Sequence, residues 1–178
     1  MNVRLLLFAA VALAATCDFA QARQAAPAWV AEACRRELCH RPKDKPDAPA
    51  LPVIQHKMLA IYPGETLFVQ AVIDAKGVSY RRASLSNDAP EQMLAFRLDA
   101  LPGDGGTTLR IHNPFKQSIR FSIGIMQVDS AMPDKVYATA SCPVGPGKSS
   151  AEHWPGRLFQ VVLRDPEVLA PGEAMDCK

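Results

Sequence analysis

Alternating apolar and polar residues run through the chain from Val53 onward and predict short β-strands. The clearest run is "SIRFSIGIMQV", in which Ile119, Phe121, Ile123 and Ile125 recur at every second position and so share one face of a strand. Further runs rich in β-branched and aromatic residues are "IQHKMLAI", "ETLFVQAVID", "VSYRRAS", "TTLRIHN", "VYATAS" and "RLFQVVLRD". Turn formers such as "YPG", "AKG" and "PGDGG" separate them. Short strands separated by turns are typical of an antiparallel β-sandwich.

The fold class that this pattern predicts is mainly β, an immunoglobulin-like antiparallel β-sandwich of about seven strands with a short N-terminal helix. The runs "YPGETLFVQ", "LRIHNPFKQSIRF" and "FQVVLRDPEVL" resemble the immunoglobulin-like sandwiches common in secreted bacterial proteins. No cysteine lies between Cys39 and Cys142, so an antibody-type Cys-Trp-Cys core is absent from the sequence. The resemblance concerns the fold alone, because such sandwiches serve as receptors, inhibitors, chaperones and metal carriers.

Two further segments precede the predicted sandwich of residues 53–178. "APAWVAEACRRELCHR" has Trp29, Val30, Ala33 and Leu38 at roughly helical spacing and predicts a short amphipathic helix. "RPKDKPDAPALP" is rich in proline with charges between, a composition that favours an extended connector over a helix or central strand. Residues 23–52 are therefore expected to hold a helix and a Pro-rich connector.

The start of the chain has the order of a secretory signal peptide. Arg4 precedes an apolar stretch over residues 5–15, and Ala20 and Ala22 supply the small residues of a cleavage site. The apolar stretch has roughly 11 residues, fewer than the roughly 20 that a helix needs to span a bilayer. We therefore expect residues 1–22 to be removed on export to the periplasm or beyond, without membrane insertion of the mature chain.

The cysteines are consistent with export. Cys17 lies in the leader, and lipoprotein processing there is the alternative to cleavage after Ala22, although Ala14-Ala15-Thr16 lacks the usual leucine. The other four form an even set, as disulfide-bonded exported proteins have. Proximity in sequence favours pairing Cys34 with Cys39, and a tethered tail favours pairing Cys142 with Cys177. The alternative is a bridge from the N-terminal helix to the body of the sandwich.

A Gly- and Pro-rich segment, "CPVGPGKSSAEHWPG", precedes the last predicted strand. It shows no regular pattern, so we expect a long binding loop that ends in a turn. Its candidate binding residues are Lys148, Glu152, His153 and Trp154. Trp154 has two interpretations. It either covers the open end of the sandwich, because large aromatic residues are mostly buried, or serves as an exposed anchor, a role in which tryptophan is enriched.

A copper site is the alternative function. "QHKM" places His56 and Met58 two residues apart, so on a strand both would project from the same side. A thioether beside an imidazole suits copper in the periplasm. His112, Met126 and His153 are further candidate ligands. The competing interpretation is that Met58 fills a gap in the core.

Catalysis and nucleic-acid binding find little support in the sequence. Ser149 and Ser150 lie near Glu152 and His153, but adjacent residues of an extended chain point to opposite sides, and no Gly-x-Ser-x-Gly turn is present. The net charge of +2 is spread along the chain, so no basic face is predicted for nucleic acid. We therefore expect an exported, non-catalytic binding protein of the cell envelope that acts on another protein as an inhibitor, immunity or accessory protein.

Overall fold

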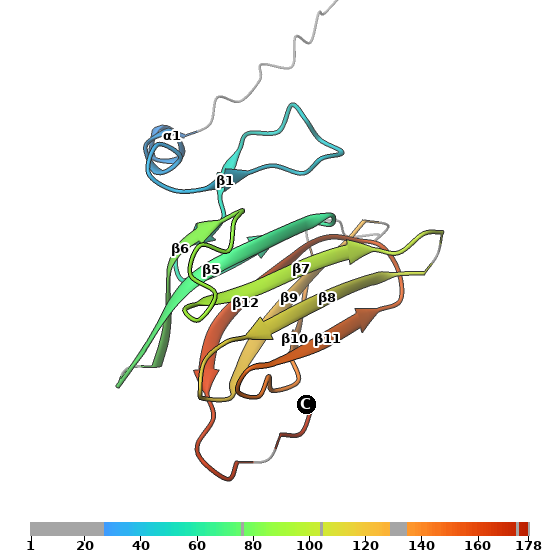
Figure 1. Cartoon of the computed structure of the whole chain (residues 1–178). Coiled ribbons are helices and arrows are strands. Elements are labelled where there is room, and N and C mark those ends of the chain that lie inside the picture. The colour runs from blue at the N-terminus through green and yellow to red at the C-terminus, as the bar shows by residue number, and fades with distance from the viewer. Residues whose placement is uncertain (1–26, 76, 104, 129–134, 174, 178) are drawn as a thin grey trace, which may run out of the picture.

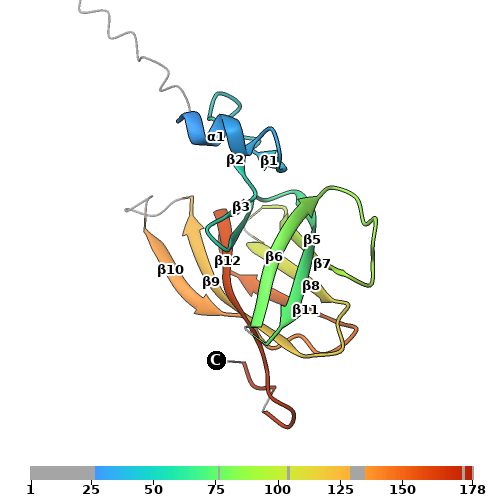
Figure 2. The same cartoon turned by 90° about the vertical axis from the view of Figure 1, so that its left-hand side faces the viewer.

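Two antiparallel sheets pack face to face and form a β-sandwich (Figures 1 and 2). The computed structural model describes residues 27–75, 77–103, 105–128, 135–173 and 175–177. The β9 sheet contains, in spatial order, β10 (Val136–Ala140), β9 (Ile119–Gln127), β12 (Leu158–Val168), β4 (Met58–Ile61) and β3 (Ile54–Gln55). The β8 sheet contains β11 (Lys148–Trp154), β8 (Thr107–Asn113), β7 (Met93–Ala100), β5 (Glu65–Asp74) and β6 (Gly77–Ser84).

A small N-terminal unit lies at one end of the sandwich (Figure 1). It consists of helix α1 (Ala28–Ala33) and a hairpin of β1 (Cys39–His40) and β2 (Leu51–Pro52). The predicted amphipathic helix is therefore shorter than its apolar pattern suggested, since Leu38 lies beyond its end. Val30 is the buried residue of α1.

The core lies between the sheets and follows the alternation expected of strands with one buried face. Phe121, Ile123 and Ile119 of β9 are fully buried, as the sequence pattern predicts. Phe96 of β7 meets Phe121 across the sheets with 5.6 Å between ring centroids, in an edge-on arrangement that aromatic pairs favour. Burial of side chains of this size contributes about 1.5–3 kcal/mol each.

The strand count departs from the predicted number of about seven. Among the described residues there are five strands in each sheet and two in the small hairpin. The prediction missed β7, in which Met93, Leu94, Phe96 and Leu98 are all buried. Leu94, Phe96 and Leu98 alternate with the half-buried Ala95 and the exposed Arg97, so the run carries the alternation of a half-exposed strand and the prediction overlooked it.

The run "IQHKMLAI" is two strands and not one. His56 and Lys57 have φ values of 46° and 69° and form the turn between β3 and β4. Positive φ at both central residues suits the tight turns of two-residue hairpins. The prediction that His56 and Met58 lie on the same side of one strand is therefore wrong.

Both predicted disulfides are confirmed. Cys34 is bonded to Cys39 and Cys142 to Cys177. Disulfides persist in oxidising compartments outside the cytoplasm, and these two indicate such an environment. Within the part of the chain that the structure describes, no helix is long and apolar enough to span a membrane. The predicted leader, residues 1–22 with Cys17, lies outside the described residues.

Candidate binding site

The Pro-rich connector is the loop between β1 and β2 at one end of the sandwich (Figure 1), and its Lys43 and Lys45 side chains contact the sandwich at Gly64 and Phe159. A cleft of about 150 Å³ lies between the connector and the sandwich. Its walls come from the connector, the β4–β5 turn, the end of β7, the end of β9 and the start of β12. The lining residues are Pro42, Lys43, Asp44, Tyr62, Pro63, Ala100, Val128, Arg157, Leu158 and Phe159.

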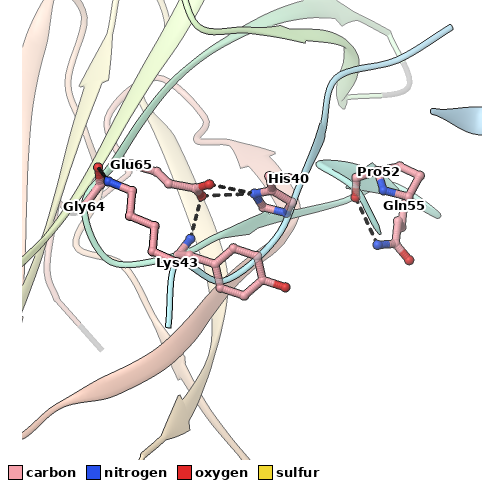
Figure 3. A network of polar contacts seen from close by, with 7 residues as sticks. His40, Lys43, Pro52, Gln55, Gly64 and Glu65 are labelled. Atoms are coloured by element: carbon pink, nitrogen blue, oxygen red, sulfur yellow. Dashed lines mark hydrogen bonds and ion pairs between the residues drawn. The ribbon is translucent and has the colours of Figure 1, made fainter. Parts of the chain in front are cut away.

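A buried polar pair holds the connector in place (Figure 3). Nδ1 of His40 lies 3.1 Å from Oε1 and 3.0 Å from Oε2 of Glu65, at the start of β5. The side chains are only 7% and 14% exposed. The backbone N–H of Tyr62 donates to Oε2 of Glu65 over 2.8 Å. One carboxylate thus joins β1, the β4–β5 turn and β5, and unpaired groups at this depth would destabilise the fold.

Further contacts fix the connector at the mouth of the cleft. Nζ of Lys43 donates to the carbonyl oxygen of Gly64 over 3.2 Å (Figure 3). Gly64 has a φ of 83°, which a residue with a side chain would adopt only with strain. Nη1 of Arg41 donates to the carbonyl oxygen of Pro46 over 2.8 Å and closes the connector on itself. The cleft is therefore preformed by contacts within the chain.

Aromatic rings form the floor of the cleft. The rings of Tyr62 and Phe159 meet edge-on with 5.7 Å between centroids, and the centroids of the His40 and Tyr62 rings are 4.5 Å apart. Nζ of Lys45 lies 4.6 Å from the Phe159 ring centroid, a cation–π distance. Burial and the nearby Glu65 carboxylate raise the pKa of Tyr62, so its hydroxyl stays neutral at physiological pH.

Positive charge dominates the rim. Lys43 and Arg157 line the cleft and Lys45 lies beside it, against the single carboxylate of Asp44. An ammonium group has three donors, and Lys43 uses one of them on Gly64. The cleft therefore offers free cationic donors above an aromatic floor, an arrangement that suits an anionic group with an apolar stem.

The size of the cleft limits what can enter it. Sites for drug-sized ligands have volumes of about 300–1,000 Å³, whereas this one has about 150 Å³. That volume matches a few water molecules at about 30 Å³ each, or one amino-acid side chain. The described lining residues combine cationic, aromatic and apolar side chains with one carboxylate. Their chemistry suits recognition of a single side chain.

The predicted binding residues lie elsewhere, on strand β11. The prediction of a long irregular loop is wrong here, because Lys148–Trp154 pairs in register with β8. Glu152 and Trp154 share one face of the strand. Trp154 packs against the core, and Oε1 of Glu152 accepts a hydrogen bond from the backbone N–H of Cys142 over 2.7 Å. His153 faces the other way, with Nδ1 at 3.2 Å from Oγ1 of Thr108. Lys148 is exposed at the start of the strand.

The three histidines among the candidate copper ligands lie on different parts of the sandwich. His56 lies in the turn of the β9 sheet, whereas His112 and His153 belong to the β8 sheet. His112 pairs with Ser149, and His153 pairs with Thr108, four residues further along β8. Given the rise per residue of a β-strand, these two positions on β8 are about 13 Å apart. Among the described residues, no group of three or more His, Cys, Asp or Glu side chains could hold a metal ion.

The residues of the cleft carried a weak signal in the sequence. Lys43, Asp44 and Lys45 lie between prolines, and Tyr62 belongs to the predicted "YPG" turn, but nothing in their spacing places them near Phe159. Comparison of the chain with protein-family models, with curated proteins and with solved structures finds no match.

Proposed function

We propose that the protein is an exported, non-catalytic binding protein of the cell envelope, periplasmic or secreted, that acts on another protein through the cleft at the end of its sandwich. The observation that carries this proposal is the preformed cleft of about 150 Å³ with a cationic rim and an aromatic floor. A preformed recognition site of this kind is compatible with an inhibitor, an immunity protein or an accessory subunit. The two disulfides support a location outside the cytoplasm.

The partner group that suits the cleft is a glutamate or aspartate side chain. Its carboxylate would pair with Lys43 and Arg157 at the rim, and its methylene groups would lie against Tyr62 and Phe159. Charge-assisted hydrogen bonds of this kind are stronger than neutral ones. The rigid connector lowers the entropy cost of binding, because few side chains need to be ordered when the partner arrives.

An immunoglobulin-like form of the sandwich belongs to the same proposal. Its support is that the chain crosses repeatedly between the two sheets. It leaves the β9 sheet after β4, forms β5 to β8 in the β8 sheet, returns for β9 and β10, crosses again for β11 and ends with β12 in the β9 sheet. Sandwiches of this form present their loops at the two ends of the strands. The cleft lies at one such end.

A photo-crosslinking experiment in the source cells tests the function. Benzoylphenylalanine replaces Val128, which lines the cleft and is 38% exposed, or Leu85, which is 68% exposed and lies outside the cleft lining. We expect irradiation to yield an adduct with one defined protein from position 128 and none with that protein from position 85. Equal adducts from both positions, or none at position 128, would contradict the proposal.

Charge reversal is the matched control for the chemistry of the cleft. Lys43→Glu with Arg157→Glu should abolish the adduct, because both cations at the rim become repulsive to a carboxylate. Arg81→Glu with Arg82→Glu makes the same charge change on β6, away from the cleft, and should leave the adduct intact. Loss of the adduct in both double variants would point to long-range charge attraction instead of recognition in the cleft.

A further inference from the structure

Strand β10 forms an outer edge of the β9 sheet (Figure 2). Its residues Val136–Ala140 pair with β9 on one side. On the other side no described strand pairs with it. An unpaired edge offers a row of backbone N–H and C=O groups to any extended segment that reaches it, and natural proteins usually protect such edges.

The other three sheet edges carry protection that β10 lacks. At the far end of the β9 sheet, β3 has only two residues. In the β8 sheet, β6 has the exposed Arg81 and Arg82 and a register shift opposite Gln70 and Ala71. The remaining edge, β11, has charged residues within its length, including Lys148 and Glu152. By contrast "VYATA" of β10 has no charge, no proline and no register shift against β9.

Apolar side chains stand exposed along this edge. Val136 is 53% exposed and Tyr137 is 36% exposed. Nζ of Lys135, just before the strand, lies 4.8 Å from the Tyr137 ring centroid. A strand with free backbone groups and exposed valine and tyrosine has the properties of an interface.

The sequence of β10 is complementary to itself. If two copies of the strand run antiparallel with Ala138 opposite Ala138, then Tyr137 lies opposite Thr139 and Val136 opposite Ala140. Aromatic and β-branched residues directly opposite each other stabilise antiparallel pairs. Lys135 would face Ser141, so the arrangement places no like charges together. A two-fold axis through Ala138 also generates a closed dimer, the commonest symmetry of soluble oligomers.

We propose that β10 pairs with β10 of a second copy of this chain about a two-fold axis at Ala138. The pairing joins the two β9 sheets into one continuous sheet with five strands from each copy. The interface lies on Val136–Ala140, none of which lines the cleft, and the occupant proposed for the cleft is a different protein. Because β10 has only five residues, the buried area falls below the roughly 1,200 Å² of a standard interface, and the dimer forms in a concentration-dependent manner.

Disulfide trapping tests the register directly. In the proposed dimer the two Ala138 positions face each other at a Cα separation of about 4.5–5.5 Å, which a disulfide can bridge. Ala138→Cys should therefore form a covalent dimer on mild oxidation. Ala151→Cys is the matched control, since Ala151 is also exposed at the middle of an edge strand. We expect at least about tenfold faster dimer formation at position 138, with both native disulfides confirmed intact by peptide mapping.

Sedimentation analysis of the mature protein tests the association without an added thiol. The wild type should shift from monomer towards dimer as its concentration rises, Ala138→Lys should remain monomeric, and Ala151→Lys should behave as the wild type. A wild type that stays monomeric up to about 1 mM, or equal trapping at positions 138 and 151, overturns the proposal. A dimer that survives Ala138→Lys also overturns it, because association then uses another surface.

Discussion

At the scale of single residues, Tyr80 carries one of several buried polar atoms that lack a hydrogen-bond partner within the described part of the chain. Its hydroxyl has no hydrogen-bond partner among the described residues. Burial raises the pKa of Tyr80, and the carboxylate of Asp165 raises it further. A neutral hydroxyl without a partner costs about 1–3 kcal/mol of stability. Tyr80 therefore lowers the free energy of unfolding at neutral pH and makes that free energy fall further at alkaline pH.

We expect Tyr80→Phe to raise the free energy of unfolding by about 1 kcal/mol at pH 7. In the wild type the unfolded chain releases the Tyr80 proton near pH 10, the ordinary pKa of tyrosine, while the folded protein retains it. The contribution of Tyr80 to the free energy of unfolding is therefore constant below pH 10. Above pH 10 this contribution falls by about 1.4 kcal/mol per pH unit. Urea unfolding at neutral and alkaline pH should show a shallower alkaline loss in Tyr80→Phe.

The control for this prediction is Tyr137→Phe. Tyr137 is 36% exposed on β10, so its loss should alter neither the neutral stability nor the alkaline slope by a comparable amount. If Tyr80→Phe were less stable than the wild type at pH 7, the hydroxyl would have a partner that stabilises it.

Residue patterns predict the core well and the turns poorly. Alternation identified Ile119, Phe121, Ile123 and Ile125 because side chains on a strand alternate between its faces. The turn at His56 and Lys57 carries neither glycine nor asparagine, the usual residues at positive φ. Its conformation depends on the pairing of β3 with β4, which the local sequence does not reveal.

At the scale of elements, β11 shows why a strand can be mistaken for a loop. Its serines and charged residues have low strand preference, and its register is set by β8 and by the turn that follows. The hydroxyl of Thr107 donates to the carbonyl oxygen of Gly156 over 3.1 Å and accepts from the N–H of Leu158 over 3.1 Å. Tertiary contacts of this kind position the end of β11, and they lie about fifty residues apart in the sequence.

The two tryptophans lie on different elements, and we expect their replacement to change the free energy of unfolding by different amounts. Trp154 of β11 packs against the core, so Trp154→Ala should lower the free energy of unfolding by about 3 kcal/mol. Trp29 of α1 is 54% exposed, and Trp29→Ala should cost less than about 0.5 kcal/mol. Chemical denaturation of both variants checks the difference. A small loss for Trp154→Ala would favour the other interpretation of this residue, a surface anchor.

At the scale of the whole molecule, sequence patterns predicted a β-sandwich and both disulfides but not the cleft. The sandwich follows from local alternation and the cysteine pairs from their spacing. The cleft instead depends on the connector returning to the sandwich, and this return rests on the contact between His40 and Glu65, which are 25 residues apart. A proline-rich composition indicates extended backbone but does not indicate its direction.

The two disulfides should differ in their contribution to stability. Cys34 and Cys39 are separated by 5 residues, and Cys142 and Cys177 by 35. In the chain-entropy model, a bridge stabilises more when it closes a longer loop, by about 2 kcal/mol for the shorter loop and about 4 kcal/mol for the longer one. Cys142→Ser with Cys177→Ser should therefore lower the melting temperature more than Cys34→Ser with Cys39→Ser, as calorimetry can measure. The reverse order would mean that the N-terminal unit contributes more to stability than its loop length indicates.

The bridge between Cys142 and Cys177 also determines how the molecule responds to mechanical force. Strands β11 and β12 both lie within the covalent loop that it closes. Tension applied at the C-terminal end passes through the sulfur atoms to Cys142, just after β10, and bypasses both strands. In the oxidised protein β12, at the centre of the β9 sheet, is thus shielded from a pull that would otherwise peel it away from β9 and β4.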